Sequence, residues 1–377
     1  MTGSNRASPV ERIPLLIPDM PRADDLIDLL REIDSHRWYT NFGPLAKRFE
    51  AQLASRFQDS GPVGVASLCN CTLALELLIS ACRLPAGSTI LVPALTFVAT
   101  GTAIRRAGHR LLVADVDPQR WTLTPEIARE AVRTHRVDCV IPVTALGCPV
   151  DAEQWDAFSA QTGIPVIVDA AGAFGNQAAG RYIAVAFSLH ATKTMGMGEG
   201  GFAVSGDGAW IERVRRLSNF GIDPSDFKVH EPGTNAKLSE YHAAVGLAAL
   251  ARWPERAALR RTLADEYRER LEALCSGIEF QQRPREGAYA ALCVLLPASA
   301  DPALVASCLA AEGIETRRWY HPPLNRHPAF ADAGVAGNLE ATARISRRLL
   351  GLPFHLDLDG ARIDTVAQRL ARILGDA

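Results

Sequence analysis

The segment Ala186-Phe-Ser-Leu-His-Ala-Thr-Lys-Thr-Met-Gly-Met-Gly-Glu-Gly-Gly201 joins an apolar strand pattern to a lysine and a glycine-rich turn. Of the 40 lysine and arginine residues only four are lysines, at positions 47, 193, 228 and 237, so Lys193 is unusual in this arginine-rich chain. A desolvated lysine can lose its proton and form a Schiff base with a carbonyl, which arginine cannot do. The alternative is a lysine that ends a strand with its head in solvent, and this segment alone leaves both open.

Length and composition indicate an ordinary globular protein. A chain of 377 residues, 48% of them hydrophobic, is long enough for about two domains. A net charge of -2 without a dense basic block argues against nucleic acid and membrane surfaces as partners. No apolar run approaches the roughly 18 residues of a spanning helix, and residues 1–11 lack the pattern of a secretory leader. We therefore expect a cytoplasmic protein.

Apolar strands and helices alternate over the first two thirds of the chain. We expect strands at 63–68, 89–92, 111–116, 137–144 and 165–168, and helices at 45–57, 72–82, 99–107, 125–134 and 152–162. Near-continuous apolar strands separated by helices favour an α/β fold, with a mostly parallel sheet and helices on both faces. Ligands of such sheets bind at the carboxyl ends of the strands.

The pattern changes after about residue 245. An arginine-rich helix is expected at 248–274, followed by strands at 289–296 and 316–320 and helices at 302–312 and 364–374. These elements predict a smaller carboxyl-terminal α+β domain. The division that follows is an amino-terminal arm at 1–45, a large domain at 46–247 and a small domain at 248–377.

Two segments outside the lysine stretch could bind an ionic ligand. At Asn70-Cys71-Thr72 a strand gives way to a helix, so a phosphate could bind Thr72 and the Leu73 backbone, although an ordinary helix cap explains the same residues. Asp169 ends its strand, and no second carboxylate lies close to it in sequence. A metal site is therefore the less favoured interpretation of this carboxylate. The cysteines, including the close pair Cys69 and Cys71, lack the spacing of a metal site.

Together these features match what pyridoxal phosphate requires. That cofactor needs a phosphate site, a ring-stacking group, an acid at the pyridine nitrogen and a lysine for its aldehyde. The helix start at Thr72, the aromatic Phe97 after a strand, Asp169 and Lys193 supply one of each. On an extended segment Ser188 and His190 would point to the side opposite Lys193, unless the strand ends before the lysine.

Further segments of the chain carry a family resemblance. They are Asn41-Phe-Gly-Pro44, Asn70-Cys-Thr-Leu-Ala-Leu75, Pro93-Ala-Leu-Thr-Phe-Val-Ala-Thr100, Asp115-Val-Asp-Pro118, Val168-Asp-Ala-Ala171, Phe187-Ser-Leu-His-Ala-Thr-Lys193, Gly198-Glu-Gly-Gly201, Gly233-Thr-Asn-Ala-Lys-Leu-Ser-Glu240 and Leu352-Pro353. In order and spacing they resemble the DegT/DnrJ/EryC1/StrS family of sugar aminotransferases, from about residue 38 to the carboxyl terminus. That family has the pyridoxal-phosphate-dependent transferase fold type I, like aspartate aminotransferase, which makes 46–247 the cofactor-binding domain.

The resemblance implies a role for each matching residue. Lys193 would form the internal aldimine and move protons, Asp169 would pair with the pyridine nitrogen, and Phe97 would stack on the ring. The phosphate would be held by residues of one helix start and one strand end: Cys71, Thr72, the Leu73 backbone and Ser188. Asn235 or Lys237 of a second subunit would complete that site, which implies a homodimer with two shared active sites.

The implied reaction moves an amino group from glutamate or glutamine to a keto sugar, expected to be nucleotide-linked, in aminosugar biosynthesis. Substrate contacts are expected from four residues: Tyr39, His190, His321 and Asn325. Two positions depart from the family pattern. Gly172 stands where the family often has Gln or His near the cofactor's phenolic oxygen, and Asn325 stands at a frequent histidine of the Tyr-x-x-Pro-x-His pattern.

Three other functions are weighed against this one. A sugar dehydratase of the same fold would replace the lysine by histidine, whereas Lys193 is present. A non-catalytic regulator that binds the cofactor would not need both Lys193 and Asp169. A nicotinamide dehydrogenase would need a Gly-x-Gly-x-x-Gly segment after the first strand, which the chain lacks.

Overall fold

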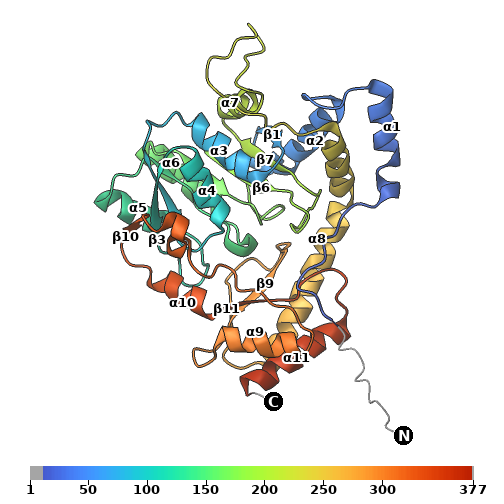
Figure 1. The fold of residues 1–377 in the computed structure, drawn as a ribbon, viewed down its shortest axis with the longest axis vertical. Coiled ribbons are helices and arrows are strands. Elements are labelled where there is room, and N and C mark those ends of the chain that lie inside the picture. Colours follow the sequence, from blue (N-terminus) through green and yellow to red (C-terminus); the bar gives the residue numbers. More distant parts are fainter. Residues whose placement is uncertain (1–11, 376–377) are drawn as a thin grey trace.

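The computed structural model describes residues 12–375, and its largest element is an eight-stranded sheet (Figure 1). Its strands are β1 (Gly64–Leu68), β2 (Thr89–Pro93), β3 (Arg110–Ala114), β4 (Cys139–Val140), β5 (Val166–Asp169), β6 (Ile183–Ser188), β7 (Gly201–Ser205) and β10 (Gly334–Ala336). In the order β1-β7-β6-β5-β4-β2-β3-β10, β7 runs antiparallel to β1 and β6, and every other pair is parallel. The predicted α/β fold with a mostly parallel sheet is confirmed.

Helices cover both faces of this sheet. They are α2 (Pro44–Ala54), α3 (Cys71–Ala81), α4 (Val98–Arg106), α5 (Pro125–Thr134), α6 (Ala152–Thr162) and α7 (Gly208–Ser218), with 3-10 turns η2 (Ser55–Ser60) and η3 (Ala145–Gly147). On one face Val168 packs in a cluster with Trp155 of α6, and on the other its neighbour Ile167 packs in a cluster with Leu78 of α3. Because successive strand residues point to opposite faces, both must be apolar.

The carboxyl-terminal part is built on the long helix α8 (Glu240–Leu274) (Figure 1). A three-stranded antiparallel sheet of β8 (Glu279–Phe280), β9 (Leu292–Leu295) and β11 (Leu349–Leu352) follows, with helices α9 (Pro302–Ala311), α10 (Glu340–Arg348) and α11 (Gly360–Leu374) and turns η4 (Leu324–Arg326) and η5 (Pro328–Phe330). The predicted helix at 248–274 begins earlier because the Ser239 hydroxyl accepts from the His242 N–H at 3.2 Å and caps it there. The proposed boundary at residue 247 therefore lies inside α8.

The amino-terminal segment runs from the small sheet to the large one. Ile13 bridges to Ile314 beyond α9, and η1 (Ala23–Asp25) and α1 (Ile27–His36) lead to α2. Residues 1–11 of the predicted arm lie outside the described residues. In the part of the chain that the structure describes, no helix is both long and apolar enough to cross a membrane.

Two predicted strands are wrong in extent. The strand at 137–144 is reduced to β4, because Pro142 has no N–H to donate to a ladder. The strand at 316–320 is only an isolated bridge, in which Arg317 exchanges two backbone hydrogen bonds with Gly351. The Trp319 ring fills the space beside Gly351, where a Cβ added to the glycine would lie 2.8 Å from the ring. After this contact the chain leaves the sheet.

Candidate active site

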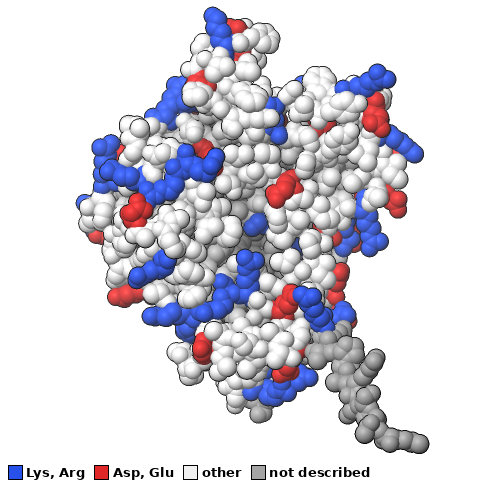
Figure 2. All heavy atoms as spheres, viewed as in Figure 1, with Lys and Arg blue, Asp and Glu red and all other residues white. Residues whose placement is uncertain are grey.

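A cavity of about 960 Å³ opens at the carboxyl ends of the parallel strands. Eight of the predicted cofactor or substrate residues line it: Cys71, Thr72, Leu73, Phe97, Asp169, Ser188, His190 and Lys193. Figure 2 shows the face of the molecule hollowed near its centre, with basic side chains at the edge of the hollow. Residues separated by more than a hundred positions in the sequence thus meet at one edge of the sheet, as the parallel arrangement requires.

Asp169 is the buried acid of this cavity, with 4% of the residue exposed at the end of β5. Its Oδ2 accepts a hydrogen bond from the Thr100 hydroxyl at 2.7 Å, and its Oδ1 accepts from the Ala171 N–H at 3.1 Å. Burial raises the pKa of Asp169, while these two hydrogen bonds and the charge of Lys193 oppose the rise. Both oxygens are therefore fixed in direction before any ligand binds.

Lys193 does not lie in a strand, because the strand ends before the lysine, which is one of the two arrangements that the sequence left open. Strand β6 ends at Ser188, and the chain then folds back, with the Ala191 N–H donating to the Gly198 carbonyl at 2.8 Å. Gly198 has a φ of +92°, which an L side chain rarely adopts, so the turn needs glycine here. This turn brings Lys193 and Ser188 into the same cavity.

The Lys193 amine is partly buried and, within residues 12–375, hydrogen-bonds to no other group. Burial lowers its pKa, and the neighbouring Cys71 and Asp169 oppose that shift. A larger fraction of this amine is thus free of its proton at neutral pH than for an exposed lysine. The structure therefore does not support the alternative in which the Lys193 amine lies in open solvent.

The start of α3 forms the anion-binding end of the cavity. The Asn70 side chain accepts from the Leu73 N–H at 2.9 Å, so the helix cap that the sequence left open is present. The Thr72 hydroxyl and the Cys71 and Thr72 N–H groups find no acceptor in the described part of the chain. These three donors, rather than the Leu73 N–H, are available to a phosphate.

Close approach of β7 shapes this end of the cavity. A Cβ on Gly201 would lie 2.6 Å from the backbone of Asn70 and Cys71, so only glycine lets the strand pass behind the helix start. Ser188 pairs with Gly201 in the sheet, and its hydroxyl accepts from the His190 N–H at 3.3 Å. The chain therefore builds a narrow polar cradle from β6, β7 and α3.

Phe97 supplies an exposed aromatic surface to the cavity. It precedes α4 as its N-cap residue, and 52% of the residue is exposed although it lines the cavity. A phosphate cradle, a fixed carboxylate, an unpaired amine and an open aromatic face are the groups that pyridoxal phosphate requires. The residues present therefore fit that cofactor. Among the described residues, no group of three His, Cys, Asp or Glu side chains could hold a metal ion.

Several cavity residues were missed by the sequence reasoning. The cavity lining also includes Thr96, Arg106, Arg317, Trp319 and Tyr320, and the buried Thr100 donates to Asp169. Burial raises the pKa of Tyr320, so its phenol stays neutral and can donate. Thr96 lies before the start of α4, outside the helix, so no helical spacing marks it and Thr100 in the sequence. Nothing local in the sequence shows that the segment at 317–320 returns to the cavity.

Five predicted residues do not line the cavity of this chain. Tyr39 stacks on Tyr241 with ring centroids 6.2 Å apart, and His321 contacts the Ser346 hydroxyl at 3.1 Å. Asn325 lies in η4 with its side-chain oxygen buried and unpaired among the described residues.

The remaining two predicted residues lie together at the surface. Lys237 donates to the Asn235 side chain at 2.7 Å and lies 4.7 Å from the centre of the Phe220 ring. Neither residue lines the cavity of this chain.

Comparison with known proteins agrees with this geometry. The chain is similar to the UDP-2-acetamido-2-deoxy-3-oxo-D-glucuronate aminotransferase of Pseudomonas aeruginosa, with 29% identity over 93% of this chain and 96% of that protein. It is similar to DesI, crystallised in the presence of its TDP-sugar product, with a TM-score of 0.87, 31% identity and coverage of 97% and 94% of the two chains. For DesV of Streptomyces venezuelae, in complex with a ketimine intermediate, the TM-score is 0.85, the identity 26% and the coverage 97% and 99%.

A family model matches residues 22–371, which is almost the whole described chain. The matched range includes Asp169, Lys193 and the start of α3. With the cavity and the sheet order described above, this match establishes the family: the chain belongs to the DegT/DnrJ/EryC1/StrS aminotransferase family.

Proposed function

We propose that this aminotransferase moves an amino group from glutamate or glutamine to a nucleotide-linked keto sugar. Pyridoxal-phosphate-dependent transamination of sugars follows from the family and from the likeness to DesI and DesV. The single observation that carries the residue-level proposal is that one cavity holds both the free amine of Lys193 and the oriented carboxylate of Asp169. The donor, the nucleotide and the residue roles below belong to the proposal.

When bound, pyridoxal phosphate supplies an electron sink for the charge that develops at the substrate carbon. Asp169 would hold a proton on the cofactor's ring nitrogen, because its two oxygens are aimed by Thr100 and Ala171. Phe97 would cover one face of the ring and exclude water from it. Asp169 would thus act through its charge and its position, and Phe97 through its position.

Lys193 would anchor the cofactor and then carry a proton between the substrate carbon and the cofactor. Its pKa is lowered by burial, so the amine can accept a proton near neutral pH and give it back. The flexible four-carbon side chain of Lys193 would let the amine move between these positions.

The phosphate would bind the donors at the start of α3 and the Ser188 hydroxyl. Asn235 or Lys237 of a second copy of this chain would complete the site in a homodimer, since neither reaches the cavity of its own chain. Exposed apolar side chains in the same projecting segment, Phe220 at 49%, Phe227 at 83% and Val229 at 57%, support burial of this surface against another copy.

A nucleotide-linked acceptor is supported by two relatives whose names specify a UDP-linked and a TDP-linked sugar. The rim of the cavity also carries Arg317, which lies over the Trp319 ring at 5.4 Å and has no carboxylate partner within residues 12–375. A guanidinium beside an aromatic ring suits a phosphate joined to a planar base.

The test is direct. Purified protein is loaded with pyridoxal phosphate, treated with L-glutamate or L-glutamine, separated from the donor and mixed with nucleotide-linked keto sugars. Mass spectrometry should show exchange of a keto oxygen for an amine on a sugar. A completed reaction with the donor but transfer to no sugar would point to another carbonyl acceptor, and no reaction with any donor would favour the non-catalytic regulator.

A further inference from the structure

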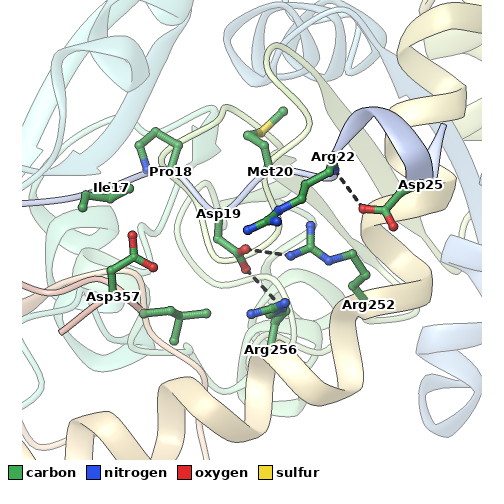
Figure 3. Close-up of a pocket in the computed structure, with 10 residues that line it drawn as sticks. Ile17, Pro18, Asp19, Met20, Arg22, Asp25, Arg252, Arg256 and Asp357 are labelled. Carbon is green, nitrogen blue, oxygen red and sulfur yellow. Dashed lines mark hydrogen bonds and ion pairs between the residues drawn. The ribbon is translucent and has the colours of Figure 1, made fainter. Parts of the chain in front are cut away.

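A second cavity, of about 380 Å³, lies beside the first and is lined mainly by charged groups. It is enclosed by the amino-terminal segment at 17–25, by α8 and by residues 356–357 after β11. Figure 3 shows the guanidinium groups of Arg22, Arg252 and Arg256 gathered around the carboxylate of Asp19. None of these residues belongs to the site described above.

The arginines of α8 are aligned along one face. Arg252, Arg256 and Arg260 are spaced four residues apart, so they form a column along the helix. Arg252 donates to Asp19 at 2.9 Å, whereas the Arg256 Nε is 3.7 Å from the other Asp19 oxygen, too far for a hydrogen bond. Asp19 thus supplies one carboxylate for the three arginines of the column.

The column lacks acceptors. The Nε atoms of Arg256 and Arg260 are buried and have no hydrogen-bond partner, and Arg260, with 4% of the residue exposed, forms no ion pair within residues 12–375. Buried guanidinium groups are normally paired, because an uncompensated buried charge is strongly destabilising. The arrangement therefore needs additional negative charge.

The other two carboxylates of the lining do not supply it. Asp25 accepts from the backbone N–H of Arg22 at 2.8 Å and caps η1. Asp357 is exposed and lies across the cavity, away from the three guanidinium groups in Figure 3. Within residues 12–375, Asp19 is thus the carboxylate that neutralises the positive side of the cavity.

We propose that this cavity binds a phosphate group between Arg22 on one wall and Arg252 and Arg256 on the other. Guanidinium groups pair with carboxylate and phosphate oxygens in bidentate geometry. Donors that converge from two walls suit a tetrahedral phosphate, which offers oxygens in all directions, better than a planar carboxylate. Bound there, the phosphate ties the amino-terminal segment to α8.

The position of the cavity suggests two sources for this group. Leu16 lines the first cavity and the next residue, Ile17, lines the second. The phosphate can therefore be a free ion that fastens the segment, or part of the diphosphate of a nucleotide-linked substrate. Only the second source rests on the proposed function.

The experiment is isothermal titration calorimetry on the full-length protein loaded with pyridoxal phosphate, at constant ionic strength. The loaded protein is used because the cofactor's own phosphate then occupies the phosphate site of the first cavity. Inorganic phosphate and uridine diphosphate are the two probes. We expect one saturable site per chain, weakened at least tenfold in Arg256→Gln and in Arg22→Gln. Arg261→Gln, a neighbour on α8 outside the lining, is the matched control and should bind as the wild type does.

Each outcome has a defined meaning. Equal affinity for both probes identifies a free phosphate ion, and tighter binding of uridine diphosphate that Arg22→Gln and Arg256→Gln weaken identifies the substrate's diphosphate. Arg22 is exposed, so Arg22→Gln remains informative even if Arg256→Gln fails to fold. No saturable binding by the wild type, or unchanged binding in both cavity variants, overturns the proposal. Neither result bears on transamination, which is assayed separately.

Discussion

The Thr100 hydroxyl of α4 donates a 2.7 Å hydrogen bond to Asp169 at the end of β5. Thr100 in turn contacts the Thr96 hydroxyl at 2.8 Å, and both threonines are buried. Since Thr100 donates to the carboxylate, Thr96 must donate to Thr100. This chain of two hydroxyl groups therefore orients the Asp169 carboxylate. The hydrogen bond from Thr100 also opposes the rise that burial causes in the pKa of Asp169.

This relationship leads to the first prediction, for Thr100→Val. Loss of a hydrogen bond to a charged group costs about 1.5–3 kcal/mol, so we expect transamination to fall about tenfold or more. The pKa of Asp169 should rise, and the acid limb of the pH–rate profile should move to higher pH, because the carboxylate must be ionised. Thr100→Ser should restore the profile. An unchanged acid limb in Thr100→Val would contradict the role of the hydroxyl.

Asp169, Lys193 and Thr100 differ in how far the sequence could predict their roles. Asp169 and Lys193 were predictable because each breaks an apolar pattern at a point where the fold class places ligands. Thr100 was not, because its function depends on a contact 69 positions away in the sequence. Trp319 and Tyr320 were assigned to a strand, since apolar and aromatic residues favour strands whenever tertiary contacts are ignored.

The environment of the arginine column could not be predicted from the sequence either. A helix rich in arginine was predicted, but its charge pattern is typical of a solvated surface. The carboxylate that organises it, Asp19, comes from a segment more than 200 residues earlier in the chain. Only the folded structure shows that Arg256 and Arg260 are short of acceptors.

Replacement of Lys193 is the second prediction. In Lys193→Gln the amine that anchors the cofactor and moves the proton is absent, and we expect transamination to fall by a factor of about 10² to 10⁴ or more. Borohydride should trap the cofactor on the peptide that contains residue 193 in the wild type and not in the variant. Lys228→Gln, with 74% of that side chain exposed, is the control and should remain active and labelled. Labelling of a different lysine in the wild type would refute the assignment.

The third prediction concerns the stability of the cofactor-free protein. The folded pKa of Asp169 lies above its unfolded value, so the folded state binds more protons between the two and stability falls as pH rises through that window. Asp169→Asn removes this penalty while its amide can still hydrogen-bond to Thr100. We expect a melting temperature above that of the wild type at pH 7, a gain that disappears below about pH 4, and loss of activity. A lower melting temperature at pH 7 would argue against the penalty.

Gly201 provides the fourth prediction. In Gly201→Ala the new Cβ would lie 2.6 Å from the backbone at the start of α3, which must move. Overpacking of this kind costs about 1–3 kcal/mol, and the shift should weaken pyridoxal phosphate binding at least tenfold. Cofactor affinity can be measured by fluorescence titration. Gly208→Ala, whose Cβ would meet nothing within 4 Å, is the matched control and should bind the cofactor normally.

Complementation between two inactive variants tests the shared active site. One variant is Lys193→Gln, and the other combines Asn235→Ala with Lys237→Ala. If each site takes Lys193 from one chain and Asn235 or Lys237 from the other, a mixed dimer contains one intact site and one doubly defective site. Random reassortment makes half of the dimers mixed, so refolding an equal mixture should recover about a quarter of wild-type activity, as two-fold symmetry requires. The separately refolded variants should stay inactive when mixed without exchange. Activity no higher than their average after exchange would mean that each chain builds its site alone.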